Sequence, residues 1–367
     1  MTSASRRVAG IKGVRDMTLN EDKLMGYVHQ AVGDLGSILS GALINIGDKL
    51  GLFTAMAGAG KMTPAELAER TGTTERYVRE WASAMAAAGY IDYAGEGRYE
   101  LNAEQAVALT DEASPAYVIG GFQGMLAATR IVPKAVEAFR TGDGIGWHEH
   151  DPDLFQGTER FFRPGYGANL VQSWIPALDG ADAKLRAGGK VADVGCGYGA
   201  STIIMAAAYP NSRFWGFDYH EPSIRHAREA AGAAGLSDRV SFEVAMAKEY
   251  PGEDFDMVCH FDCLHDMGDP VGAARHARES LKDDGHWLLV EPFANDNVAD
   301  NLNPIGRVFY SASTLICTPA SLSQEVGAGL GAQAGEARLR EVAEAAGFSS
   351  FRRATETPFN LVLEGRP

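Results

Sequence analysis

The sequence predicts an α/β protein, a doubly wound and mostly parallel sheet preceded by an α-rich domain with a winged-helix pattern. Three observations carry this prediction. Short apolar runs alternate with helical segments from residue 190 onward, a glycine-rich turn follows the first run, and two short helical patterns precede a hairpin near the N-terminus. At roughly 100–200 residues per domain, 367 residues suffice for two domains that each bury a core.

The composition fits an ordinary globular chain, with 46% hydrophobic and 22% charged residues, which excludes disorder. The 33 Lys and Arg against 48 Asp and Glu give a net charge of −15, which argues against binding nucleic acid or anionic membrane through a basic surface. The four cysteines form no C-x-x-C pair, and we identify neither a secretory signal nor an 18-residue uncharged apolar stretch. We therefore expect a reduced, cytoplasmic protein without a membrane span.

The order of patterns predicts three segments. We expect a helical and winged-helix dimerisation domain over residues 1–120, a helical connector and lid over 121–180, and the α/β domain over 181–367.

The first element is a long helix. Apolar residues recur at steps of three and four from Leu24 to Leu50, which places them on one stripe. Two interpretations stay open for this stripe, packing in the core of the same chain or a subunit interface with a second copy.

A winged-helix pattern follows. Thr63 caps a helix that starts with Pro64 and carries Glu66 three residues after the cap, a second helix runs to Gly89, and a hairpin turns around 95–97. Residues 48–104 hold six basic and nine acidic side chains, a net charge of −3, which is the wrong sign for phosphate binding. We therefore do not expect nucleic acid as a partner.

Residues 105–180 are mostly helical in pattern, with two aromatic turns. Trp147 lies in a glycine-rich turn and Tyr166 follows Phe161-Phe162-Arg163-Pro164-Gly165. Either aromatic residue could contact a substrate or pack the domain junction, and we count both as candidate substrate contacts.

From residue 190 onward, five apolar runs predict strands. They span 191–194, 213–218, 240–244, 255–259 and 285–290, with helical segments between them. Ligands of such sheets bind at the carboxyl ends of the strands, where the glycine turn and Asp218 fall.

The glycine turn reads Asp193-Val194-Gly195-Cys196-Gly197-Tyr198-Gly199. Its third glycine comes one residue too early for the dinucleotide fingerprint, and Asp193 would repel a pyrophosphate but suits a cationic ligand. Asp218, at the end of the second strand, can accept hydrogen bonds from both hydroxyls of a ribose.

These residues resemble motif I of class I S-adenosylmethionine-dependent methyltransferases. His265-Asp266-Met267-Gly268-Asp269-Pro270 resembles the His-Asp-x-x-Asp segment of small-molecule O-methyltransferases, and 281–291 is similar to a later strand of that family. Nearly the whole chain resembles the bacterial winged-helix methyltransferases. The resemblance implies a Rossmann-like domain, S-adenosyl-L-methionine as cofactor, and a homodimer formed through the N-terminal domain.

The resemblance also implies the cofactor residues. Asp193 supports the loop and the methionine ammonium, Asp218 takes the ribose, and Tyr219 stacks beside the adenine. Two positions depart from the family, because Met246 stands where an acid often binds the adenine amino group, and Phe261 stands where plant relatives often carry a lysine. The full predicted set is Asp193, Gly195, Cys196, Gly197, Asp218, Tyr219, Ala245, Met246 and Phe261.

His265 is the predicted general base, since methyl transfer by in-line attack mainly requires alignment of the acceptor and removal of its proton. Glu291 would orient His265 or the substrate. The insertion 303–335 supplies Arg307 and Tyr310 as candidate substrate contacts. No metal site is predicted.

The predicted function is S-adenosylmethionine-dependent methyl transfer to a hydroxyl of a small molecule. Two alternatives stay open. The first is a winged-helix regulator that uses the α/β domain as a metabolite sensor. The second is a metal-assisted C-methyltransferase of 2-oxo acids, in which Asp262, His265 and Cys317 would gather around an ion. The sequence leaves the acceptor open, as it does the choice among O-, N- and C-methylation.

Overall fold

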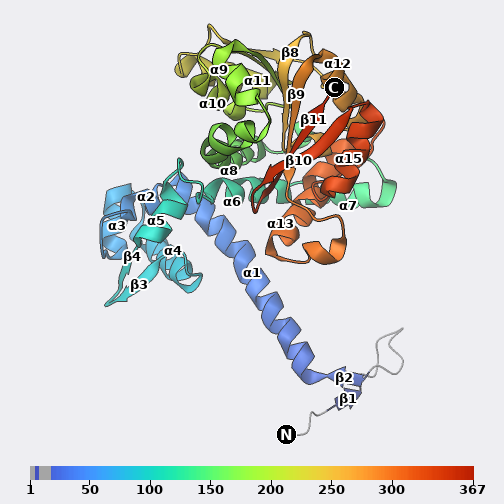
Figure 1. Cartoon of the computed structure of the whole chain (residues 1–367). Coiled ribbons are helices and arrows are strands. Elements are labelled where there is room, and N and C mark those ends of the chain that lie inside the picture. The colour runs from blue at the N-terminus through green and yellow to red at the C-terminus, as the bar shows by residue number, and fades with distance from the viewer. Residues whose placement is uncertain (1–4, 8–17) are drawn as a thin grey trace. The chain divides into compact units, whose positions relative to one another are not determined.

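The computed structural model describes residues 5–7 and 18–367 and divides into two compact units, Met1–Thr110 and Asp111–Pro367 (Figure 1). The segment 121–180, which the sequence suggested as a separate connector and lid, belongs to the second unit. Its helix α8 (Pro152–Asn169) packs against α6 (Ile119–Thr129) and α10 (Ala200–Ala208), so its apolar residues share the core of the sheet.

The first unit has the predicted order of helices and hairpin. The Thr63 hydroxyl accepts from the Glu66 N–H, and the Glu66 carboxylate accepts from the Thr63 N–H at 2.7 Å, which completes the capping box expected at the start of α3. The elements are β1 (Ser5–Arg7), β2 (Thr18–Asn20), α1 (Glu21–Lys49), α2 (Leu52–Met56), α3 (Pro64–Thr71), α4 (Glu75–Ala87), β3 (Asp92–Gly95), β4 (Arg98–Glu100) and α5 (Ala103–Thr110).

Helix α1 packs on the winged-helix elements only near its C-terminal end. A Cβ atom on Gly47 would come within 2.7 Å of the rings of Phe53 and Trp81, so this glycine allows the helix its close approach. Trp81 Nε1 donates to the Leu43 carbonyl at 2.9 Å.

The apolar stripe predicted on α1 is largely exposed. Seven of its residues are between 39% and 68% exposed: Leu24, Val28, Val32, Leu35, Leu39, Ile46 and Leu50. The first of the two interpretations, packing of the stripe in the core of the same chain, is therefore not what the structure shows.

The second unit is built on a seven-stranded sheet of order β10-β11-β9-β8-β5-β6-β7. Strands β5 to β9 are parallel, whereas β11 pairs antiparallel with both β9 and β10. The strands are β5 (Lys190–Val194), β6 (Arg213–Asp218), β7 (Val240–Val244), β8 (Phe255–Phe261), β9 (Leu281–Pro292), β10 (Ser350–Glu356) and β11 (Asn360–Arg366). The five predicted strands are present, and the sequence analysis did not anticipate β10 and β11.

Helices cover both faces of this sheet (Figure 1), as a doubly wound Rossmann-like fold requires. Side chains alternate along each strand, so that on β5 Val191 faces one core while Ala192 and Val194 face the other. The remaining helices are α7 (Val132–Thr141), α9 (Ala181–Gly188), α11 (Glu221–Ala233), α12 (Pro270–Ser280), α13 (Pro304–Ala312), α14 (Thr318–Leu322) and α15 (Gly335–Ala346).

Within the described part of the chain, every helix is too short or too polar to traverse a lipid bilayer.

Candidate active site

The glycine turn joins β5 to α10 at the carboxyl edge of the sheet. Gly195, Gly197 and Gly199 all have left-handed backbones, with φ of 75°, 52° and 81°. A Cβ on Gly195 would lie 2.7 Å from the sulfur of Cys263, whereas a Cβ on Gly197 would meet no atom within 4 Å. The first glycine therefore allows close packing, and the backbone at the second is open to a ligand.

Asp218 connects the end of β6 to this turn. Its Oδ2 accepts from the Gly197 N–H at 2.9 Å and its Oδ1 accepts from the His220 N–H at 2.8 Å. Burial raises the pKa of this carboxyl, while the two backbone donors lower it. The carboxylate retains lone pairs for two ribose hydroxyls, because each oxygen can accept more than one hydrogen bond.

Asp193 lies behind the turn and is completely buried. Its Oδ2 accepts from the hydroxyls of Ser201 and Thr202, both at 2.6 Å, and burial raises its pKa to about 6. The side chain braces the junction of the turn and α10, which is the loop-supporting part of its predicted role.

A pocket opens in front of the turn. Eight of the nine predicted cofactor residues line it, and Asp193 lies behind them. The eight are Gly195, Cys196, Gly197, Asp218, Tyr219, Ala245, Met246 and Phe261.

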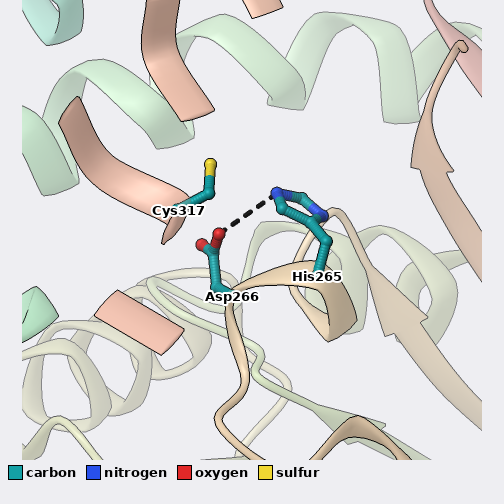
Figure 2. A group of neighbouring side chains, drawn as sticks. All are labelled: His265, Asp266 and Cys317. Atoms are coloured by element: carbon teal, nitrogen blue, oxygen red, sulfur yellow. Dashed lines mark ion pairs between the residues drawn. The ribbon is translucent and has the colours of Figure 1, made fainter. Parts of the chain in front are cut away.

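His265 occupies a short helical turn after β8, at the side of this pocket. Its ring is 3% exposed, its Nδ1 bonds the Glu291 carboxylate, and its Nε2 lies 3.2 Å from Asp266 Oδ1. Figure 2 shows Asp266 and Cys317 facing that second nitrogen. Asp266 lines the pocket, so the cluster meets the pocket at this residue.

The electrostatic balance of the cluster favours a protonated ring. Burial alone would lower the pKa of His265, but Glu291 and Asp266 outweigh it and raise the pKa well above its usual value. The prediction paired His265 with Glu291, and the structure places them in contact, with Glu291 also accepting from the Leu264 N–H at 3.0 Å.

The same cluster offers one nitrogen, one oxygen and one sulfur donor. The donor atoms of His265, Asp266 and Cys317 lie within 4.8 Å of one another, and Glu291 holds the opposite side of the imidazole ring. This set suits a transition-metal ion. Asp262, which the sequence analysis had considered as a ligand, is not part of it.

Asp262 lies in the pocket wall at the end of β8. Its backbone is left-handed, with φ of 50°, and its carboxylate accepts from the Tyr166 hydroxyl at 2.8 Å and the Asn360 amide at 3.0 Å. Burial and the neighbouring Glu291 carboxylate raise its pKa to about 7. The sequence analysis missed this pocket residue in its final set, since nothing local to 255–262 marks it.

The predicted substrate contacts divide into two pairs. Trp147 and Tyr166 line the pocket, whereas Arg307 and Tyr310 lie on α13, outside the pocket-lining set, with Arg307 exposed. Phe155, Phe162 and Tyr198 also line it but were not singled out from the sequence.

The comparisons with known proteins match both parts of the chain. Residues 185–341 match the family described as "Methyltransferase domain", and residues 39–111 match the "Rv2258c-like winged HTH domain". The 27-O-demethylrifamycin SV methyltransferase of Amycolatopsis mediterranei is 34% identical over 131 residues, which cover 34% of this chain and 48% of that protein. The chain thus spans about half the length of this relative.

Two further proteins match over most of the chain. The mitomycin biosynthesis 6-O-methyltransferase of Streptomyces lavendulae is 25% identical over 296 residues, 77% of this chain and 82% of that protein. The structure of human N-acetylserotonin methyltransferase in complex with SAM covers 96% of this chain and 99% of its own, with a TM-score of 0.68 and 16% identity, which shows a shared fold.

The predicted combination is confirmed at this level: residues 39–111 match a winged-helix domain and residues 185–341 match a methyltransferase domain.

Proposed function

We propose that this chain transfers a methyl group from S-adenosylmethionine to a hydroxyl of a small molecule. The observation that carries the proposal is one continuous pocket that brings the glycine turn and Asp218 together with Asp266 of the His265 cluster. The relatives from Amycolatopsis and Streptomyces are named as methyltransferases of rifamycin and mitomycin compounds, which supports a small-molecule acceptor.

The residues present fit the cofactor. Asp218 supplies the acceptor oxygens that a ribose needs, the Gly197 backbone is open, and Tyr219 and Met246 offer an aromatic and an apolar surface for adenine. When bound, S-adenosylmethionine supplies an electrophilic methyl group on a sulfonium. The protein's own task is then to orient the acceptor, exclude water and take up a proton.

We assign proton uptake to the cluster of His265, Asp266 and Glu291. With a protonated imidazole and two carboxylates the cluster carries a net charge of −1, so it can accept one proton. Asp266 lines the pocket and contacts His265, so we assign Asp266 as the group of the cluster that takes up the proton of the substrate hydroxyl.

Isothermal titration with S-adenosylmethionine and S-adenosylhomocysteine tests the cofactor half of the proposal. Absence of binding at millimolar ligand would overturn it. His265→Ala and Asp266→Asn test the other half, with an expected loss of about 10²–10⁴-fold in kcat at unchanged cofactor affinity. Full turnover in both variants would refute the assignment of proton uptake.

We propose further that the chain is a homodimer through the exposed stripe on α1. The stripe spans most of a 29-residue helix, and apolar patches of that extent mark interaction surfaces. Leu39→Glu places a charge in it, at a residue that is 68% exposed and therefore costs the monomer little. Light scattering should show a dimer for the wild type and a monomer for the variant. A monomeric wild type would contradict the proposal.

A second candidate is metal-assisted transfer to the carbon of a 2-oxo acid, which the N, O and S donors of His265, Asp266 and Cys317 favour (Figure 2). Titration with Zn²⁺ separates the two candidates. Stoichiometric binding that Cys317→Ser abolishes would favour the metal-assisted reaction, and absence of binding would remove it.

A further inference from the structure

We propose that Asp262 is the residue that binds a protonated amine in this pocket, either the ammonium of the cofactor's methionine part or an amine on the acceptor. The inference rests on the proposed function and adds that the site selects a ligand with a positive charge.

The position of Asp262 is held from three sides. Its N–H donates to the Val290 carbonyl of β9 at 2.8 Å, Tyr166 of α8 donates to Oδ2, and Asn360 of β11 donates to Oδ1. A left-handed backbone on a residue other than glycine costs free energy, and such residues cluster at functional sites. These contacts hold the carboxylate in the pocket wall despite that cost.

The partners of this carboxylate are neutral donors. Tyr166 and Asn360 each supply one hydrogen bond and no charge, so the negative charge of Asp262 is solvated but not balanced by them. A charge set in a pocket wall favours a counterion. Nearby, His265 offers one positive charge, which Glu291 and Asp266 already contact on its two nitrogens. Asp262, Asp266 and Glu291 therefore place three carboxylates near this one imidazole.

The other charged groups that line the pocket have partners of their own. Lys248 donates to Asp269 at 3.3 Å and to Glu325 at 3.0 Å, and Glu159 pairs with Arg163 at 2.8 Å. Asp262 is therefore the pocket carboxylate best suited to an incoming ammonium. Burial and the Glu291 carboxylate raise its pKa to about 7, and a bound cation would favour its ionised form.

Asp262 also lies beside the glycine turn. The next residue, Cys263, donates its S–H to the Val194 carbonyl at 3.2 Å and sits against Gly195. Asp193, the predicted partner of the methionine ammonium, lies behind the turn and does not line the pocket. An ammonium that enters beside the turn would meet Asp262 instead. Asp262 also lies only three positions before His265 in the sequence.

The test compares two pairs of ligands, and in each pair one member carries an amine that the other lacks. S-adenosylhomocysteine carries the ammonium and 5′-methylthioadenosine lacks the amino-acid part. Tyramine carries an amine and tyrosol, otherwise similar, carries a neutral hydroxyl. Affinities are measured by isothermal titration, the second pair on protein loaded with S-adenosylhomocysteine. We expect Asp262→Asn to lower the affinity of one amine-bearing ligand by about 10- to 100-fold and to leave its neutral partner unchanged.

The affected pair identifies the source of the amine. Loss confined to S-adenosylhomocysteine assigns Asp262 to the cofactor, and loss confined to tyramine assigns it to the acceptor. Asp262→Glu keeps the charge and should restore most of the preference for the amine, whereas Glu159→Gln, a matched loss of a carboxylate elsewhere in the pocket, should not alter either affinity ratio.

Changes below about twofold in both pairs for Asp262→Asn, in protein with an unchanged circular dichroism spectrum, would overturn the inference. Failure of the wild type to bind either nucleoside would instead refute the proposed function, and this inference with it.

Discussion

Replacement of Asp218 by Asn tests the central contact of the cofactor site. Both carboxylate oxygens accept from backbone donors, Gly197 N–H at 2.9 Å and His220 N–H at 2.8 Å. An amide has only one oxygen, so in either orientation its NH₂ group opposes a backbone N–H. One charge-assisted hydrogen bond is lost, and the ribose loses an anionic acceptor. At about 1.5–3 kcal/mol for a hydrogen bond to a charged group, we expect the Kd for S-adenosylhomocysteine to rise about 10- to 150-fold.

The same change has an opposing effect on stability. Burial raises the pKa of Asp218, so the neutral amide avoids the desolvation cost of the carboxylate, and this gain offsets part of the lost hydrogen bond. We therefore expect cofactor binding to fall more than the free energy of unfolding, as measured by titration calorimetry and urea unfolding. Glu221→Gln is the control, because this exposed acid begins the next helix and pairs with Arg225 at 3.5 Å. A Kd within about twofold of the wild type for Asp218→Asn would refute the reasoning.

Three further predictions concern the turn behind the pocket and the first domain. Folding raises the pKa of Asp193 from 3.8 to about 6, so this carboxyl loses its proton at a lower pH in the unfolded chain than in the folded one. The free energy of unfolding, measured with urea, should therefore fall by up to about 3 kcal/mol between pH 4 and pH 6. The variant Asp193→Asn should show no such fall. Gly195→Ala should lower the melting temperature more than Gly197→Ala, because both carry left-handed strain but only the first places a Cβ 2.7 Å from the Cys263 sulfur; equal melting temperatures would contradict the assigned packing. Duplex DNA on a column should not retain the protein at physiological salt, since the winged-helix segment 48–104 carries a net charge of −3; salt-sensitive retention would favour the regulator alternative.

The parallel part of the sheet could be predicted because most of its strands are buried on both faces, whereas β7 alternates buried and more exposed residues. Each of β5 to β9 contains a short apolar run that is recognisable without knowledge of its neighbours. Strand β10 has the sequence Ser-Phe-Arg-Arg-Ala-Thr-Glu, with one buried residue, and its place at the sheet edge depends on pairing with β11. An edge strand of this kind gives little local signal, which explains why β10 was missed.

Some residues of the candidate site could likewise be predicted from the sequence, and others could not. Gly195, Gly197 and Asp218 follow strands directly, so the chain order places them at one edge of the sheet. Asp262 also ends a strand, but its environment is made by Tyr166, 96 residues earlier, and Asn360, 98 residues later. Only the tertiary packing of α8 and β11 shows that this carboxylate is held in the pocket wall with neutral partners.

His265 shows why a residue type does not by itself indicate its chemistry. An isolated imidazole titrates near neutral pH, and on that ground the sequence favoured it as a base. In the fold, Glu291 and Asp266 contact its two nitrogens and raise its pKa well above the usual value, so the ring does not behave as an isolated imidazole. In the reaction we propose, the capacity to accept a proton belongs to the cluster, whose carboxylates outnumber its imidazole, and Asp266 is its member that lines the pocket. The relative effects of His265→Ala and Asp266→Asn therefore report how the three groups share one proton, which neither residue type can indicate alone.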